Sequence, residues 1–429
     1  MLRKVCVFAL LILVLIGAVL ATETLEILFW TRPNPLWVNF WEKMAEKYMA
    51  SNPVVAGKLV KVKVMPMPEK PTSEAAIQMS IAAGTVADGS ENIVTGFAHL
   101  LAKEGHLVPL DTLPGFWELM EKRAMKDLIL RWKAPDGHIY LIPNFSNPKL
   151  YAWRMDILRT LGFGEPPKDY NQVFELGKRL KEKYPEKFLM ADTRTVEPTW
   201  WKRWGDFFPF YYANTDARFI TENKLTADEE IIIKVFEFFH ELYDKGYLLT
   251  AKVRDPFPTG VCVWTRINSW DPLKWKTKFP ELVFGRDYVV TGPVPAPCSE
   301  QPINFFTDEK GLVIYANSSS EEREAIWDFY KFVLSDVKND IFYFETTGVL
   351  PVRGDVATNP ELSSLRVAET ALWSFAVSNA IPSTNHPKFA EILETLGVEG
   401  FIPALKGERT PEEAWKKAKA KILVLLQEE

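Results

Sequence analysis

The sequence predicts an α/β protein whose parallel strands are joined by crossover helices. Apolar runs of strand length alternate with segments of helical spacing, and cap signals open the later helices. A strand–helix–strand–helix order favours a parallel sheet, because parallel neighbours need a long crossover connection. The chain has 429 residues, 47% of them hydrophobic, which is enough for a large core and about two domains.

The first elements follow this alternation. Leu25–Trp30 (LEILFW) is a strand-like apolar run that ends at a Pro-Asn-Pro turn signal. The next segments alternate in period, with helical spacing at Trp37–Met49, strand spacing at Lys58–Met65 and helical spacing again at Ser73–Ala83. Val283–Val290 and Gly311–Tyr315 are predicted as later strands.

Four later helices are predicted from their N-terminal caps. A Ser, Thr or Asp followed three residues later by Glu or Gln satisfies the first free backbone N–H groups of a helix. Such pairs are Asp169 and Gln172, Thr226 and Glu229, Ser319 and Glu322, and Thr410 and Glu413. Pro411 strengthens the last of them, because proline suits the first helical position.

The N-terminal segment indicates export. Arg3 and Lys4 precede about a dozen apolar residues and then small residues up to Ala21, which is typical of a secretory signal peptide. We predict that residues 1–21 are the signal peptide, cleaved near Ala21, and that the protein is periplasmic or extracellular. The alternative is an uncleaved anchor, which the shortness of the apolar run disfavours.

Charge and cysteine content narrow the function classes. The formal net charge is −5, and losing Arg3 and Lys4 leaves 49 basic against 56 acidic residues, or −7. This balance argues against nucleic acid as a partner. Cys262 and Cys298 either form one disulfide or are two small buried hydrophobic residues. We favour the second reading, because a chain of this size needs no covalent link.

No sequence motif indicates a catalytic site. The chain has no Gly-rich phosphate loop, no zinc-site spacing among its five histidines and no nucleophile elbow. We therefore predict no catalytic residue, no metal and no cofactor. A glycosidase needs only two carboxylates without a short signature, so an exported glycoside-active enzyme stays an alternative. A surface glycan-binding protein is the other alternative.

Several short motifs occur in order along nearly the whole chain after residue 21. The stretches are Leu25–Trp30, AAGT at 82–85 with Asp88, GHLVPLD at 105–111, YLIP at 140–143, LYAWRMD at 150–156, residues 162–174, NSW at 268–270, GVLPVR at 348–353 and TPEEA at 410–414. Together they resemble the family 1 extracellular solute-binding proteins, the group that includes maltose-binding protein. The chain departs from the family pattern at Ala87, Asp169 and Asn268, where proline, threonine and glycine are usual.

The resemblance implies a type II-like periplasmic-binding-protein fold, in which two α/β lobes close by a hinge over a ligand held between them. The first lobe would comprise residues 22–142 and 291–345, and the second lobe 143–290 and 346–429. Two Pro-rich stretches, Leu141–Pro148 and Thr291–Pro302, fall where the chain would cross between lobes. The resemblance further implies a monomer that captures a carbohydrate or polyol and delivers it to the permease of an ABC importer.

Candidate ligand-binding residues lie at strand ends and in loops, because open parallel sheets bind ligands beyond the carboxyl ends of their strands. Aromatic platforms and planar polar groups suit a sugar, whose C–H faces stack on indole. The candidates are Trp30, Arg32, Asn34, Asn144, Phe145, Trp204, Trp270, Asn304, Phe305 and Asp308.

Structural roles compete with ligand binding at several of these positions. Core packing is the alternative for Trp30, and turn formation is the favoured role for Asn34. Trp204 is chosen from a cluster with Trp200 and Trp201, one face of which we expect in the core. For Trp270, stacking on a ligand is implied by the resemblance alone. Trp264 is assigned to the core.

Overall fold

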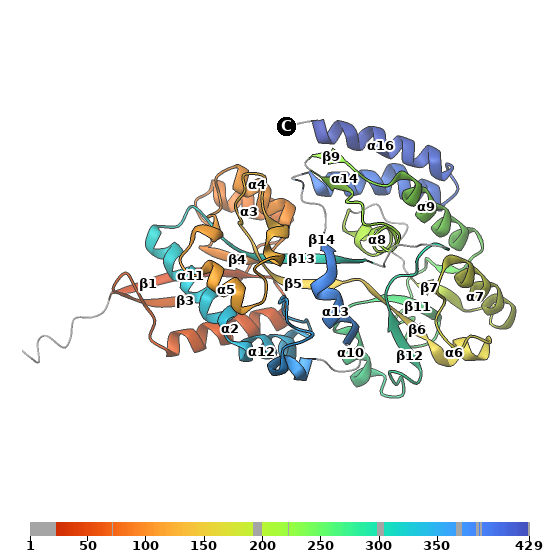
Figure 1. Ribbon diagram of the computed structural model, residues 1–429, viewed down its shortest axis with the longest axis horizontal. Coiled ribbons are helices and arrows are strands. Elements are labelled where there is room, and N and C mark those ends of the chain that lie inside the picture. The colour runs from red at the N-terminus through yellow and green to blue at the C-terminus, as the bar shows by residue number, and fades with distance from the viewer. Residues whose placement is uncertain are drawn as a thin grey trace, which may run out of the picture. The chain divides into compact units, whose positions relative to one another are not determined.

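The computed structural model describes residues 23–70, 72–191, 200–221, 223–297, 304–365, 371–382, 386 and 388–427. The chain forms two compact units, each discontinuous in sequence (Figure 1). Unit 1 is the described part of Met1–Ser90 together with Ile314–Val333, and unit 2 is the described part of Glu91–Val313 and Leu334–Glu429. These bounds differ from those of the two predicted lobes, whose boundaries stay a prediction.

Unit 1 is built on parallel strands. Strand β1 (Thr24–Thr31) pairs in parallel along its whole length with β3 (Lys58–Pro66) and, near its end, with the start of β4 (Gly89–Ile93). Strand β2 (Val54–Val55) pairs with β3 in the antiparallel direction. The helices of this part of the chain are α2 (Pro35–Ala50), α3 (Ser73–Ala82) and α11 (Ser320–Ser335). All four early elements predicted from the sequence are confirmed.

Aromatic packing joins the two sequence segments of unit 1. The Phe29 ring of β1 lies 4.5 Å from the Trp41 ring of α2, 6.0 Å from that of Phe329 and 5.9 Å from that of Tyr330. Gly89 permits this approach, because a Cβ there would lie 2.3 Å from the Tyr330 hydroxyl. Helix α11 therefore packs beside β1 in Figure 1 although the two are far apart in sequence.

A five-stranded sheet forms one core of unit 2. Its strand order is β10 (Leu248–Leu249), β7 (Phe188–Ala191), β11 (Cys262–Ile267), β6 (Leu150–Arg154) and β12 (Tyr288–Thr291). The first three strands are parallel, and β6 runs antiparallel to both of its neighbours. At its centre the rings of Trp153 and Trp264 stack 4.7 Å apart, and both residues are fully buried. The assignment of Trp264 to the core is confirmed.

Strands β5 (Ile142–Pro148) and β13 (Phe305–Ile314) form an antiparallel pair in unit 2, and β14 (Ala380–Pro382) joins β13 in parallel. The register places Asn147 opposite Asp308, and it shifts at a β-bulge that leaves Asn144 without an opposite residue. Strand β5 coincides with the first predicted Pro-rich crossing, and every one of its residues is buried.

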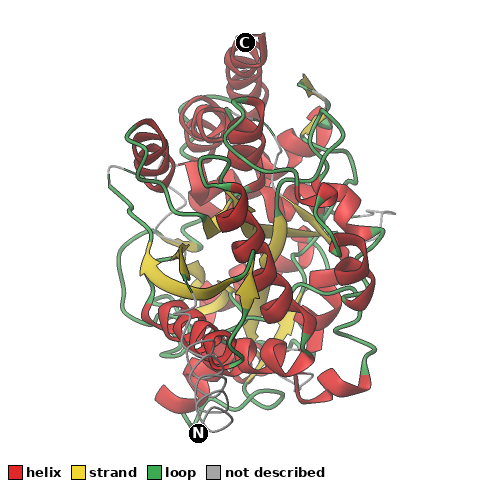
Figure 2. Ribbon diagram, turned by 90° about the vertical axis from the view of Figure 1, so that its left-hand side faces the viewer, coloured by secondary structure: helices red, strands yellow, loops and turns green. Residues whose placement is uncertain are grey.

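The rest of unit 2 consists of helices and short elements. Figure 2 draws the helices of the chain in red and its strands in yellow. The α-helices are α4 (Thr95–Lys103), α5 (Phe116–Lys122), α6 (Met155–Thr160), α7 (Tyr170–Lys183), α8 (Phe208–Tyr212), α9 (Glu229–Asp244), α10 (Asp271–Lys278), α12 (Val337–Thr347), α13 (Ala371–Asn379), α14 (Phe389–Thr395), α15 (Ile402–Leu405) and α16 (Pro411–Gln427). Strands β8 (Ile220–Thr221) and β9 (Lys224–Leu225) form a small hairpin. The 3-10 segments η1 to η4 are Leu110–Thr112, Leu128–Trp132, Trp200–Trp204 and Pro360–Leu365, and a π-helical segment spans Leu396–Phe401.

Three of the four predicted helix caps are confirmed, and the fourth is wrong. The pairs Ser319–Glu322 and Thr410–Glu413 each exchange two hydrogen bonds, and Asp169 accepts from the backbone N of Gln172 at 2.9 Å. Helix α9 is instead capped by Asp228, which accepts from the backbone N of Ile231. The Thr226 hydroxyl donates to the Arg218 carbonyl at 2.6 Å, so it is not used as a cap.

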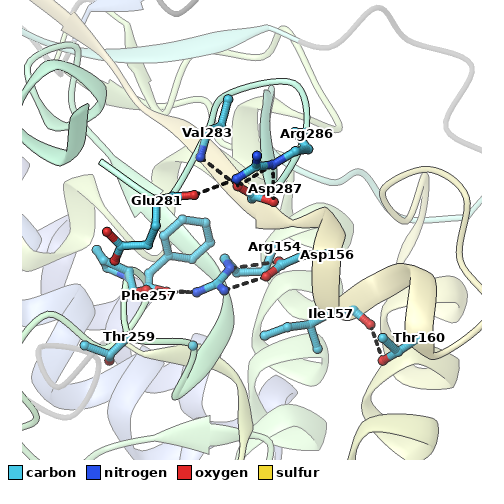
Figure 3. A network of polar contacts seen from close by, with 12 residues as sticks. Arg154, Asp156, Ile157, Thr160, Phe257, Thr259, Glu281, Val283, Arg286 and Asp287 are labelled. Atoms are coloured by element: carbon cyan, nitrogen blue, oxygen red, sulfur yellow. Dashed lines mark hydrogen bonds and ion pairs between the residues drawn. The ribbon is translucent and has the colours of Figure 1, made fainter. Parts of the chain in front are cut away.

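The strand predicted at Val283–Val290 begins only at Tyr288. A turn precedes it, in which an Asp287 carboxylate oxygen accepts from the backbone N of Val283 at 2.8 Å (Figure 3). Arg286 pairs with Asp287 at 2.7 Å and also donates to the Glu281 carbonyl. Side-chain capping of the turn thus overrides the apolar spacing of the sequence.

Arg154, at the end of β6, fixes a neighbouring loop of the same sheet. Its guanidinium pairs with Asp156 at 2.6 Å and donates to the carbonyls of Phe257 and Pro258 at 2.9 and 3.0 Å (Figure 3). The loop before β11 is therefore held against the start of α6. Among the described residues, every helix is too short or too polar to span a membrane. The predicted signal peptide and its cleavage site lie outside the described residues.

Candidate functional site

Buried polar side chains gather along β5 and β13 in unit 2. Asn144 donates to a carboxylate oxygen of Glu91 at 3.0 Å, and the hydroxyls of Ser146 and Thr307 lie 2.8 Å apart. Asn147 is only 1% exposed. Burying so many polar groups on two adjacent strands is costly unless hydrogen bonds compensate for the lost water. The pair of strands is therefore the strongest candidate for a binding function in unit 2.

Strand alternation divides these residues between two faces of the β5–β13 pair. Asn147 and its opposite residue Asp308 share one face, on which Phe145 and Lys310 also oppose each other. The Lys310 amine lies 6.0 Å from the Phe145 ring centroid, consistent with this shared face. Glu309 faces the other side, opposite Ser146.

The titratable side chains differ between the two faces of the β5–β13 pair. Lys149 is 3% exposed, and its Nζ lies 3.9 Å from an Asp308 carboxylate oxygen, so the two charges balance each other. Burial raises the pKa of the Glu309 carboxyl to about 8, although the positive charges of Arg218 and Arg131 act to lower it. At neutral pH the Glu309 side chain is therefore largely protonated, because its pKa lies above the pH.

The turn that precedes α10 lies next to this strand pair. Asn268 accepts a hydrogen bond from the Asn147 amide at 2.8 Å, and the Ser269 hydroxyl donates to the Gly348 carbonyl at 2.9 Å. Gly348 has a φ of 71°, and a Cβ on it would lie 2.9 Å from the Cβ of Trp270. Glycine thus allows the Trp270 backbone to approach the end of α12 closely.

Three of the predicted ligand-binding residues lie in unit 1. Trp30 is 6% exposed and makes an edge contact with Tyr315, at 6.5 Å between ring centroids. The Arg32 guanidinium lies 4.5 Å from the centroid of the Trp37 ring. Asn34 caps α2 by accepting from the backbone N of Leu36 at 3.0 Å, which is the turn-forming role favoured for it.

The other seven predicted residues lie in unit 2. Four of them belong to strands β5 and β13, namely Asn144, Phe145, Phe305 and Asp308. The ring of Phe305, at the start of β13, lies 6.0 Å from that of Phe375. The amide of Asn304 reaches the Thr215 carbonyl at 3.5 Å. Trp204 is buried at the end of η3, and Trp270 is partly exposed before α10. For all ten residues, contact with a ligand stays a prediction.

Two side chains of the site were missed from the sequence. Asn147 and Lys149 alternate with Phe145 along the chain, so a strand reading of residues 142–149 would have placed all three on one face. The prolines at 143 and 148 instead suggested an irregular crossing. Pairing with the edge of β13 tolerates these prolines, which is why the segment is extended.

The described residues contain no group of three His, Cys, Asp or Glu side chains placed to hold a metal ion. Cys262 is fully buried and has no disulfide partner within the described part of the chain, and burial raises the pKa of its thiol to about 12. A thiol with such a pKa is a poor nucleophile and a poor metal ligand at neutral pH. Its predicted alternative partner, Cys298, lies outside the described residues.

Comparisons with known proteins agree with this architecture. The family model of the bacterial extracellular solute-binding proteins matches residues 43–369. The sn-glycerol-3-phosphate-binding periplasmic protein UgpB of Brucella abortus is 24% identical over 271 residues, which is 60% of this chain and 59% of that protein's own length.

Solved structures extend the similarity over nearly the whole chain. A crystal structure of an uncharacterized protein from Listeria monocytogenes is 37% identical, with a TM-score of 0.83 over 94% of this chain and all of the other. The cyclic α-maltosyl-1,6-maltose binding protein of Arthrobacter globiformis shares the fold at 18% identity, with a TM-score of 0.77 over 95% of this chain and all of the other. The chain therefore belongs to the bacterial extracellular solute-binding proteins, which bind solutes rather than catalyse reactions and have the mixed α/β fold predicted from its sequence.

Proposed function

We propose that this protein is the substrate-binding component of an ABC importer, which captures a carbohydrate or polyol outside the cytoplasmic membrane and delivers it to a permease. The family match over residues 43–369 is the observation that carries this proposal. In the family that the chain resembles, two lobes close over the ligand by a hinge, and the permease recognises the closed form. The protein acts as a monomer and needs no nucleic acid or cofactor.

The polar residues of β5 and β13 support a hydroxyl-rich ligand. Amide and carboxylate groups such as Asn144, Asn147 and Asp308 form directional hydrogen bonds that distinguish hydroxyl patterns, whereas alkyl side chains do not. The partly exposed Trp270 and the exposed Phe375 add aromatic surface in the same unit. We propose that all ten predicted residues contact the ligand.

Thermal unfolding with a panel of sugars and polyols tests this proposal. A ligand that binds only the folded protein stabilises it by RT ln(1 + L/Kd), where L is the free ligand concentration, so the unfolding midpoint rises with the logarithm of that concentration once it exceeds Kd. We expect at least one neutral compound to raise it, and mass spectrometry to recover that compound unchanged. Product release from a glycoside would instead support a glycoside-active enzyme, and binding only to insoluble glycan would support a surface glycan-binding protein.

The extracellular location of the family is consistent with cleavage of the N-terminal segment near Ala21. N-terminal sequencing of protein secreted from its native cell tests this. A mature chain that begins near Thr22 supports the proposed signal peptide. A chain that keeps residues 1–21 and stays with the membrane fraction contradicts cleavage and supports an anchor.

A further inference from the structure

The side-chain amide of Asn147 is held in one orientation by a relay of hydrogen bonds. An oxygen of Asp271 accepts from both the backbone N and the Nδ2 of Asn268, at 2.7 and 3.0 Å. The Oδ1 of Asn268 must then point away from Asp271, and it accepts from the Nδ2 of Asn147 at 2.8 Å. This relay fixes which amide atom faces which way, so the Oδ1 of Asn147 is the atom turned away from Asn268.

Asp308 presents a second acceptor oxygen beside Asn147. The two residues are directly opposite across the β5–β13 pair, so their Cβ atoms lie about 5 Å apart on one face. Its Oδ2 lies 3.9 Å from the Nζ of Lys149, too far for a hydrogen bond. Neither the Oδ1 of Asp308 nor that of Asn147 has a hydrogen-bond partner among the described residues, and both atoms are buried.

Two buried acceptor oxygens on adjacent strands indicate a ligand that donates hydrogen bonds. A native protein seldom retains buried oxygens without donors, because each loses its hydrogen bond to water on burial. We propose that Asn147 and Asp308 form a specificity-determining pair, which accepts hydrogen bonds from two neighbouring hydroxyl groups of the solute and rejects a phosphate group at that position. This inference rests on the proposed function, because it states the chemistry of the solute.

Rejection of phosphate follows from the same two oxygens. A phosphate monoester carries between one and two negative charges at neutral pH and presents acceptor oxygens. Facing it with a carboxylate and an amide oxygen gives repulsion and no hydrogen bond. Two amines share this face, and each has a partner of its own: the Nζ of Lys149 lies 3.9 Å from the Asp308 carboxylate, and the Nζ of Lys310 lies 6.0 Å from the centroid of the Phe145 ring. A sugar or cyclitol instead supplies the two O–H donors without charge.

The chain offers a matched control for this pair. Glu309 is the next residue of β13 and is also a buried carboxyl, but its side chain lies on the opposite face, across from Ser146. Asp308→Asn and Glu309→Gln each replace a carboxyl with an amide on opposite faces of one strand, but only the first also removes a negative charge, because Glu309 is largely protonated at neutral pH. Only the first replaces an acceptor of the proposed pair with a donor.

The experiment measures binding of two probe sets to the full mature chain by thermal shift and calorimetry. One set is neutral: glucose, maltose, maltotriose, trehalose and myo-inositol. The other set is sn-glycerol-3-phosphate, glucose 6-phosphate and inorganic phosphate. We expect a neutral compound to bind and the phosphates not to bind. Asp308→Asn should weaken the neutral ligand about 10- to 100-fold, the usual effect of losing a hydrogen bond to a charged group, and Glu309→Gln should leave its Kd within about threefold.

Each outcome decides between the two proposals. If phosphate esters bind and neutral compounds do not, the role as the solute-binding component of an importer stands, whereas the neutral ligand and the inference are overturned. If no probe of either set binds to cooperatively folded protein, the proposed function fails and the inference with it. Asn147→Leu gives a second variant in case Asp308→Asn does not fold. Unchanged affinity in both variants would also overturn the inference, as would equal losses in Asp308→Asn and Glu309→Gln.

Discussion

Two buried strand pairs of unit 2 are built on opposite principles. In β6 and β11 the centre is the Trp153–Trp264 stack, with ring planes only 6° apart and both residues fully buried. In β5 and β13 the centre is polar, and four buried side-chain oxygens have no hydrogen-bond partner among the described residues. These belong to Asn144, Asn147, Asp308 and Glu309. The first pair stabilises the fold, whereas the second buries polar groups at a cost in stability, and we propose that these groups bind the solute.

The largest expected effect on stability comes from disrupting the apolar strand pair, β6 and β11. Trp264→Ala should lower the free energy of unfolding by about 3–5 kcal/mol, because it removes a fully buried ring and leaves a cavity beside Trp153. Urea unfolding followed by circular dichroism measures this. A loss below about 1 kcal/mol would mean that the sheet repacks around the gap, and the contrast between the two strand pairs would then be wrong.

The buried Glu309 of the polar strand pair, β5 and β13, predicts that the free energy of unfolding depends on pH. The folded-state pKa of Glu309, about 8, lies above the value of 4.5 for an exposed glutamate, so the folded protein holds this proton more tightly. Its contribution to stability is therefore complete below about pH 4.5 and is lost as the pH rises through 8. Relative to Glu309→Gln, the wild type should lose up to about 1.4 kcal/mol per pH unit in that window.

Urea unfolding of both proteins at intervals from pH 4.5 to 8.5 checks this difference. The charged groups that act on Glu309 are Arg218, Arg131 and Asp308. Parallel stability curves for wild type and Glu309→Gln would show that the carboxyl is already ionised in the folded protein.

A smaller effect on stability is expected from removing a hydrogen bond within the polar strand pair, β5 and β13. Ser146→Ala removes the hydroxyl that lies 2.8 Å from that of Thr307 and should cost about 1 kcal/mol, the usual net value of such a bond. The midpoint of urea unfolding measures it. A stabilised variant would indicate that burying these two hydroxyls costs more than their hydrogen bond returns.

The smallest effect is expected outside both pairs. Arg286→Ala removes the ion pair with Asp287 in the turn before β12, where the arginine is 64% exposed (Figure 3). Water and salt screen such surface pairs, so the unfolding midpoint should shift less than in Ser146→Ala. A larger shift would show that this turn, rather than the strand interior, determines the position of β12.

Sequence periodicity predicted the regular elements well where the local signals agreed. Leu25–Trp30 and Trp37–Met49 became β1 and α2, because apolar spacing and the Pro-Asn-Pro turn signal between them indicated the same structure. It failed where side chains compete for the backbone, as when Asp228 rather than Thr226 caps α9. It also missed Asn147, because the prolines at 143 and 148 suggested an irregular crossing. The contact of Asn147 with Asn268, more than a hundred residues later, is one that no local pattern carries.

The core of unit 1 has a consequence for the order in which the chain folds. Phe29 packs against Phe329 and Tyr330, which the ribosome adds some 300 positions later. The first strand and helix thus remain incomplete during most of synthesis and stay exposed to chaperones. The export that we propose would gain time from this arrangement, because the core around Phe29 cannot be completed before residues 329 and 330 have been synthesised.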